Sequence, residues 1–226
     1  SLRRRVAYGA VRGLRKVALG LSLAGGLAAG AAAEEAVIAA LGDSLTQGYG
    51  LPPERGFVPQ LQDWLEAEGH DVRLINAGVS GDTTAGGLSR VDWTLTDEVD
   101  GLIVALGGND LLRGIDPEVS RENLAGILAA AEAAGVEVLL VGIRAPGNYG
   151  PDYKAAFEAM YPDLAEAYGA LFVEDFLGGL DAAQEAGASM GALMQPDGIH
   201  PSARGVEAIV AALGPAVARL VGRIEG

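Results

Sequence analysis

A serine, a histidine and an aspartate in this sequence have the types and spacing that nucleophilic acyl transfer requires. Ser44 lies in residues 42–45, Gly-Asp-Ser-Leu, whereas Asp197 and His200 lie three residues apart in residues 197–201, Asp-Gly-Ile-His-Pro. A serine hydroxyl is a poor nucleophile until a base takes its proton, and a carboxylate holds a histidine base in the right tautomer. We therefore expect Ser44 to attack a carbonyl, His200 to take the proton and Asp197 to orient His200.

The small number of histidines simplifies this assignment. The chain has two, and the other, His70, follows Gly69 in an expected helix-to-strand turn, where we interpret it as a surface or packing residue. A single histidine is more often structural than catalytic, so the prediction depends on the combination of segments. The chain has no cysteine, which excludes a thiol nucleophile and a cysteine zinc site.

Two glycine-containing segments could stabilise a developing negative charge. Residues 76–84, Asn-Ala-Gly-Val-Ser-Gly-Asp-Thr-Thr, contain Gly81, whose N–H no side chain would obstruct, and residues 107–110, Gly-Gly-Asn-Asp, contain the amide donor Asn109. Each segment alone also fits an ordinary turn, the first with Asp82 as the cap of a helix. Their positions after apolar runs favour the functional interpretation.

Those apolar runs predict the scaffold. Short aliphatic segments alternate with longer amphipathic ones, which is typical of a parallel sheet covered by helices on both faces. Ligands bind at the carboxyl ends of the strands in such sheets, where the four segments above lie. The expected strands are residues 36–41, 72–75, 102–106, 136–141 and 171–173.

The intervening segments predict at least four helices. Two carry apolar stripes at i, i+3, i+7 spacing, two are rich in alanine, and the last begins near Ala203 with Ser202 as its cap. The stripes are Val58, Leu61 and Leu65 in the first helix and Leu88, Val91 and Leu95 in the second, and the alanine-rich helices are residues 117–134 and 152–170.

The first 33 residues differ from the rest of the chain. Six basic residues precede an apolar run from Val17 to Ala33, which ends in three alanines. This pattern predicts a secretory signal peptide, residues 1–33, cleaved near Ala33 before a single domain, residues 34–226. The alternative is an uncleaved anchor, but 17 apolar residues rich in glycine are marginal for spanning a bilayer. We expect an exported, periplasmic protein, through the general secretory rather than the twin-arginine route, with no stable membrane anchor after processing.

The net charge of the mature domain limits the kinds of partner that it can bind. All 30 acidic residues follow residue 33, together with 10 of the 16 basic residues, so residues 34–226 carry a net charge of about −20. Nucleic acid is therefore not an expected partner. The glycine-rich turns contain neither a P-loop nor a dinucleotide fingerprint, which disfavours nucleotide binding.

The four segments together resemble a known superfamily. In chain order, Ser44, Gly81, Asn109 and His200 match the four blocks that give the SGNH hydrolases their name, across the whole of residues 34–226. The surrounding strings are similar to those of the periplasmic thioesterase I and arylesterase group, whose members also act as lysophospholipases. These strings are residues 42–46, 80–83, 106–110 and 197–201, with further similarity at 143–150 and 161–162.

The resemblance implies a fold and a function. It implies a three-layer α/β/α, flavodoxin-like domain with a five-stranded parallel sheet in the order 2-1-3-4-5. It also implies an oxyanion hole formed by the N–H groups of Ser44 and Gly81 and the side chain of Asn109. The expected activity is that of a serine esterase on small acyl esters or thioesters, with no metal or cofactor.

The acyl group that the enzyme prefers depends on loops that the blocks do not define. We expect the lining to include Leu111, Leu112, Ile115 and Pro146, although each could instead belong to the core. Two other functions stay open: a carbohydrate O-acetylesterase, and a binding protein that keeps the fold without catalysis. The complete set of block residues argues against the second.

Overall fold

The computed structural model describes residues 35–226, so the expected signal peptide lies outside the described residues. A parallel sheet of five strands forms the centre, in the order β2-β1-β3-β4-β5, which confirms the predicted order. The strands are β1 (Ala36–Gly42), β2 (Val72–Gly78), β3 (Gly101–Ala105), β4 (Glu137–Val141) and β5 (Leu171–Val173).

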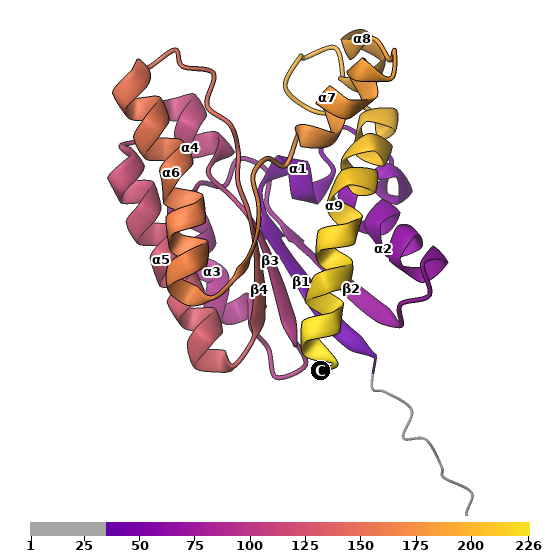
Figure 1. The fold of residues 1–226 in the computed structure, drawn as a ribbon, viewed down its shortest axis with the longest axis vertical. Helices are drawn as coiled ribbons and strands as arrows, with labels where there is room; N and C mark the ends of the chain where they lie inside the picture. The colour runs from indigo at the N-terminus through magenta and orange to yellow at the C-terminus, as the bar shows by residue number, and fades with distance from the viewer. Residues whose placement is uncertain (1–34) are drawn as a thin grey trace, which may run out of the picture. The chain divides into compact units, whose positions relative to one another are not determined.

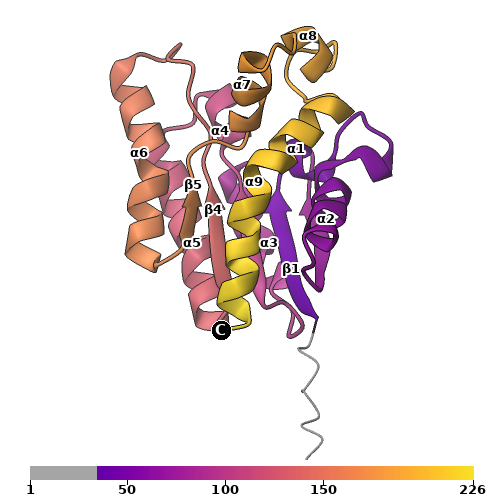
Figure 2. The same ribbon diagram turned by 45° about the vertical axis from the view of Figure 1, so that its right-hand side comes forward.

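Helices cover both faces of the sheet, which confirms the α/β class (Figure 1). Helices α3 (Thr84–Thr94), α5 (Pro117–Ala134) and α6 (Pro151–Tyr168) pack on one face, and α2 (Phe57–Ala67) and α9 (Ala203–Ile224) pack on the other. The short elements α1, α4, α7 and α8 gather at one end of the sheet, opposite the carboxyl terminus of the chain (Figure 2). Their bounds are Ser44–Gln47, Gly108–Arg113, Gly178–Glu185 and Met190–Leu193, and a 3-10 turn, η1, spans Pro53–Arg55.

The residues of the central strands are apolar because helices cover both faces of the sheet. Every residue of β1 and β3 is buried, as expected for strands covered on both faces. The predicted stripe of α2, Val58, Leu61 and Leu65, is buried as well. Helix α9 is the one described helix long and apolar enough to cross a membrane by composition, but ten of its residues are buried against the domain core.

The end of β2 differs from its predicted boundary. The strand continues three residues beyond Ile75, pairing Gly78 with Gly42 of β1. Asparagine, alanine and glycine have low strand propensity, so the pattern alone did not extend the strand. Gly78 permits the extension because a Cβ there would clash with the backbone of Gln47 in α1.

The start of α3 also differs in detail from the sequence interpretation. The side chain that caps the helix is Thr83, whose hydroxyl accepts from the Gly86 N–H at 3.3 Å, rather than Asp82. Leu95 lies just past the helix end, and it packs half-buried against the core, as Leu88 does. Ser202 caps α9 as predicted, accepting from the Gly205 N–H at 3.2 Å.

Candidate active site

The serine, the histidine and the aspartate form one hydrogen-bonded chain, although 153 residues separate Ser44 from Asp197 in the sequence. The Oγ of Ser44 lies 2.9 Å from Nε2 of His200, and Nδ1 of His200 lies 2.6 Å from Oδ2 of Asp197. With Nδ1–H donating to the carboxylate, Nε2 faces the serine with its lone pair. This arrangement can remove a proton from the serine hydroxyl.

Local backbone structure brings Ser44 to this position. β1 ends at Gly42, and Asp43 caps α1 by accepting from the Leu45 N–H at 3.0 Å. Ser44 is therefore the first residue of α1, where N–H groups have no intrahelical partner. Gly42 is required because a Cβ there would collide with the side chain of Thr46, which is buried.

A tight turn holds the aspartate and the histidine together. Oδ1 of Asp197 accepts from the N–H groups of Ile199 and His200, at 2.9 and 3.0 Å, and Gly198 takes the left-handed conformation with φ of 68°. The hydrogen bond from the His200 backbone, then that from its ring and that from Ile199, lower the pKa of Asp197 to about 2. The Asp197 carboxylate is therefore ionised, and it accepts a hydrogen bond from the His200 ring.

Gly81 lies in the loop between β2 and α3, and Asn109, the second residue of α4, bonds both to this loop and to Asp43. Gly81 has φ of 84°, a conformation that favours glycine, and no hydrogen bond from its N–H is found within residues 35–226. The Nδ2 of Asn109 donates to Oδ2 of Asp43 at 3.1 Å and to the Asp82 carbonyl at 2.9 Å. Both amide hydrogens are thus engaged in the free protein, so any further acceptor at Nδ2 would have to share or replace one of these bonds.

Asp43 is itself an unusual neighbour for an anion site. Its side chain is 2 % exposed, and burial raises its pKa against the opposing hydrogen bonds from Leu45 and Asn109. Asp43 therefore links the loop of Ser44 to the loop of Asn109. The sequence analysis named Asp43 as part of a motif but did not predict its hydrogen bond with Asn109.

Arg90 of α3 donates hydrogen bonds both to the loop after Gly81 and to the chain before Ser44. The sequence analysis did not identify this residue. Its Nε donates to Asp82 Oδ2 at 2.6 Å, and its two Nη atoms donate to the carbonyls of Ala77 and Gly42, at 2.7 and 2.9 Å. One guanidinium thus connects the residue after Gly81 with the residue two before Ser44. A single arginine at the eighth position after Asp82 carries no sequence signal for such a role.

The loop of Asn109 rests on a buried tyrosine. Tyr161 of α6 donates its hydroxyl to the Leu106 carbonyl at 3.0 Å, and burial raises its pKa well above the usual range. Gly107 follows with φ of 116°, and a Cβ there would meet the Tyr161 hydroxyl. Gly107 therefore lets the chain pass closely over α6 before Asn109.

Two further residues contact the histidine loop, and sequence reasoning missed both. The ring of Tyr49 packs 4.5 Å, centroid to centroid, from the His200 ring at a tilt of 37°. Nε2 of Gln195 donates to the carbonyls of Tyr49 and Pro201, at 2.8 and 2.9 Å. His70 is remote from these contacts in sequence and is half-buried in the turn after α2, with its N–H donating to Leu65.

The four expected lining residues differ in exposure. Leu111 is 8 % exposed and belongs to the core, whereas the side chain of Leu112 is 63 % exposed. Ile115 is half-buried and Pro146 is exposed. The structure therefore leaves Leu112 and Pro146 as the two that solvent reaches most readily.

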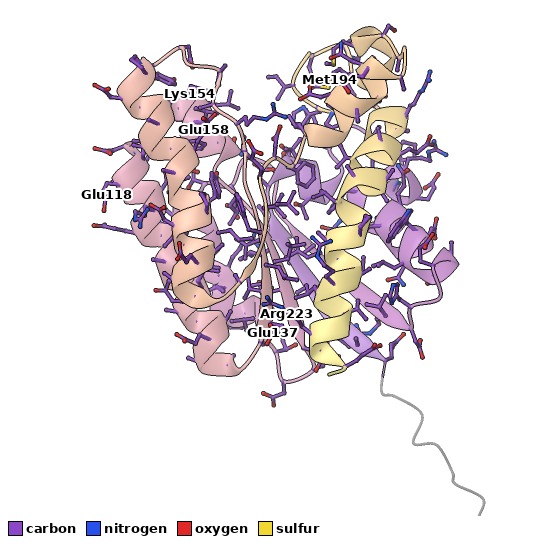
Figure 3. The ribbon with its side chains drawn as sticks, viewed as in Figure 1. Glu118, Glu137, Lys154, Glu158, Met194 and Arg223 are labelled. Atoms are coloured by element: carbon purple, nitrogen blue, oxygen red, sulfur yellow. The ribbon has the colours of Figure 1, made fainter. Side chains whose placement is uncertain are left out.

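The loop that contains Pro146 is held by an ion pair on α6. Glu158 accepts from the Ala145 N–H at 2.9 Å, and Lys154 donates to the Ala145 carbonyl and to Glu158, both at 2.6 Å. Figure 3 shows this pair at the end of α6 nearest the short helices. In residues 35–226, no group of three or more histidine or acidic side chains is arranged to hold a metal ion.

A serine bonded to a histidine that a carboxylate orients, on a parallel α/β fold, is the arrangement of a serine hydrolase, and the family comparison agrees. Residues 40–208 match the model of the GDSL-like Lipase/Acylhydrolase family, and the chain belongs to that family. The protein is accordingly a serine hydrolase that acts on carboxylic esters.

Named relatives support the assignment. Esterase TesA of Pseudomonas aeruginosa is 44 % identical over 163 residues, which cover 72 % of this chain and 78 % of that protein. Thioesterase 1/protease 1/lysophospholipase L1 of Escherichia coli K12 is 36 % identical over 163 residues, 72 % of this chain and 74 % of that protein. The crystal structure of AlinE4, an SGNH-hydrolase family esterase, is 46 % identical, with a TM-score of 0.66 over 82 % of this chain and 96 % of that chain.

Proposed function

We propose that this protein is an exported serine esterase that hydrolyses carboxylic esters and thioesters through an acyl-enzyme on Ser44. The hydrogen-bonded chain from Ser44 Oγ through the His200 ring to Asp197 is the observation that carries the proposal. Nucleophile, base and orienting carboxylate all lie within hydrogen-bond reach of their neighbours. The names of the relatives, esterase, thioesterase and lysophospholipase, describe the same reaction type on different leaving groups.

The proposed reaction has two halves. Ser44 Oγ attacks the acyl carbon while His200 Nε2 takes the hydroxyl proton, and the imidazolium then gives this proton to the departing alcohol or thiol. Water then attacks the acyl carbon and gives a proton to Nε2; the bond from the acyl carbon to Ser44 Oγ breaks, Oγ takes the proton back from Nε2, and the acid is released. In each half the oxyanion would accept from the N–H groups of Ser44 and Gly81 and from Asn109 Nδ2.

The acyl chain is proposed to lie across the exposed side chains of Leu112 and Pro146, with Ile115 behind them. A substitution series at these positions tests the placement, because a changed apolar surface should change the preferred chain length. If chain-length preference is the same in all variants, this placement is wrong.

A p-nitrophenyl ester series, from acetate to long-chain acyl, tests the activity itself. Wild-type protein should cleave at least part of the series, and Ser44→Ala should be silent on all of it. A carbohydrate O-acetylesterase would instead cleave acetylated sugars and leave the longer aryl esters. Failure of the wild type on every ester would favour a binding protein.

Export is proposed from residues 1–33 alone, with their basic start, apolar run and terminal alanines. Expression of the full chain in a Gram-negative host, followed by fractionation and N-terminal sequencing, provides the test. Periplasmic protein that begins near Glu34 supports cleavage. Full-length protein retained in the membrane would support the uncleaved anchor.

A further inference from the structure

We infer that Gln195 is a positioning residue, which holds the base His200 at hydrogen-bond distance from the nucleophile Ser44 by joining the two loops that carry them. This inference rests on the proposed function, because it concerns the proton transfers of the same reaction. The side chain of Gln195 donates its hydrogen bonds to backbone carbonyls, so it acts on the reaction through His200 and not on the substrate.

His200 lies in a loop whose tip receives little support from the core. Leu193 and Pro201 are buried at the base of this loop, where the Ser202 N–H donates to the Leu193 carbonyl at 2.8 Å. Residues 196–199, which form the tip, are exposed. The position of His200 therefore depends on polar contacts more than on apolar packing.

Gln195 supplies three of these polar contacts. Its backbone N–H donates to the His200 carbonyl at 2.8 Å, and its Nε2 donates to the carbonyls of Pro201 and Tyr49, at 2.9 and 2.8 Å. Both hydrogens of the amide are thus used. The opposite orientation of the amide would place Oε1 against two carbonyl oxygens, so the contacts define which way the side chain points.

The contact with Tyr49 extends this network to the nucleophile. The Tyr49 N–H donates to the Ser44 carbonyl at 3.1 Å, so hydrogen bonds lead from Ser44 through Tyr49 and Gln195 to His200. The Tyr49 ring also packs 4.5 Å, centroid to centroid, from the His200 ring. Proton transfer requires that base and nucleophile stay within hydrogen-bond reach, and this network maintains the 2.9 Å between Nε2 and Oγ.

Gly50 gives the glutamine the room that it needs between the two loops. A Cβ on Gly50 would collide with Oε1 of Gln195, and the φ of 74° at this position also favours glycine. Gln195 therefore fits closely against the chain that follows Tyr49.

Two leaving groups of different basicity test the inference. Phenyl butyrate and p-nitrophenyl butyrate share an acyl chain and an aromatic ring, but phenolate is the stronger base and depends more on the proton that His200 Nε2 delivers. The readout is the ratio of kcat/KM for the p-nitrophenyl ester to kcat/KM for the phenyl ester. This ratio compares the acylation steps of the two substrates.

Gln195→Met keeps an unbranched side chain of similar length and removes both N–H donors. We expect kcat/KM to fall about tenfold for the p-nitrophenyl ester and about fiftyfold for the phenyl ester, a part of the roughly 10²- to 10⁴-fold that general acid–base catalysis supplies. The ratio should thus rise about fivefold. Gln195→Asn keeps the donors on a shorter side chain, so its ratio should lie between those of wild type and Gln195→Met. If Gln195→Met does not fold, Gln195→Asn carries the test.

Gln62→Met is the matched control. Gln62 is also half-buried and also joins two segments, since its Nε2 donates to the Val72 carbonyl at 2.6 Å and its Oε1 accepts from the Leu74 N–H at 2.7 Å. These contacts connect α2 with β2 and involve no residue of the proposed triad. Gln62→Met should lower the midpoint of urea unfolding, as Gln195→Met does, and leave the ratio at the wild-type value.

Two outcomes overturn the inference. If Gln195→Met lowers kcat/KM for both esters by the same factor, or changes neither, Gln195 does not position His200. An equal rise of the ratio in Gln62→Met would mean that any loosening of the fold produces the effect. Wild-type protein that cleaves neither ester contradicts the proposed function itself, which separates that failure from a failure of the role of Gln195.

Discussion

Asn109 shows how one side chain can serve both the fold and the reaction. Its Nδ2 bonds to Asp43 and to the Asp82 carbonyl join the two loops that flank Ser44, and the same Nδ2 is the proposed donor to the oxyanion. The loops are therefore held in place by the group that the transition state would use. Donation to the oxyanion therefore requires that one of these two hydrogen bonds be shared or replaced.

Replacement of Asn109 by alanine should lower kcat by about 10²- to 10³-fold, as removal of one oxyanion donor does. Steady-state kinetics on a p-nitrophenyl ester measures it. Asn123→Ala is the control, since Asn123 Nδ2 donates to Thr84 Oγ1 in a network that includes the buried Asp110. The Asn123→Ala variant should lose stability and keep its kcat. If the two variants have equal kcat values, Asn109 has no role in the reaction.

Asp197 should make the free energy of unfolding decrease as the pH falls into the acid range. Its folded-state pKa is about 2, below the ordinary 3.8, so the unfolded chain binds a proton first as the pH falls. The stabilisation is complete above pH about 4 and is lost between about 4 and 2. Denaturant unfolding of wild type and Asp197→Asn across this range should show their difference shrinking as the pH falls. A difference that is constant with pH would contradict the assigned hydrogen bonds.

Arg90 joins α3 to the ends of β1 and β2. Arg90→Met removes three hydrogen bonds that fix the loops of Ser44 and Gly81. We expect kcat to fall about tenfold with a smaller change in KM, since a displaced oxyanion donor weakens the transition state more than the ground state. Arg73→Met, which removes an ion pair with Glu98 near the other end of β2, should leave kcat unchanged. An unchanged kcat in Arg90→Met would refute the positioning role.

The elements of the fold and the contacts between them differ in how well the sequence predicts them. Buried strands and long helices follow from apolar periodicity. The segments of Ser44, Gly81 and Asn109 follow the ends of β1, β2 and β3, whereas the segment of Asp197 and His200 lies between α8 and α9. Short helices such as α7 and α8 give too little periodicity to recognise. The contacts of Arg90, Tyr49 and Gln195 depend on residues brought together only by the fold: Gln195 bonds to the Tyr49 carbonyl, 146 positions away.

For the molecule as a whole, stability rests on one core without disulfides, because the chain has no cysteine. Leu102 of the central strand β3 is completely buried, so Leu102→Ala should lower the free energy of unfolding by about 2–5 kcal/mol. Leu112→Ala, at an exposed position, should change it by less than about 0.5 kcal/mol. Urea unfolding of both variants makes the comparison. Similar losses for the two would mean that Leu112 is packed rather than exposed.

Covalent trapping shows whether Ser44 is the nucleophile. A fluorophosphonate should add to wild-type protein with one equivalent per chain, and peptide mass spectrometry should place the adduct on Ser44. The Ser44→Ala protein should remain unmodified under the same conditions. An adduct on another residue, or equal labelling of the Ser44→Ala protein, would contradict the account.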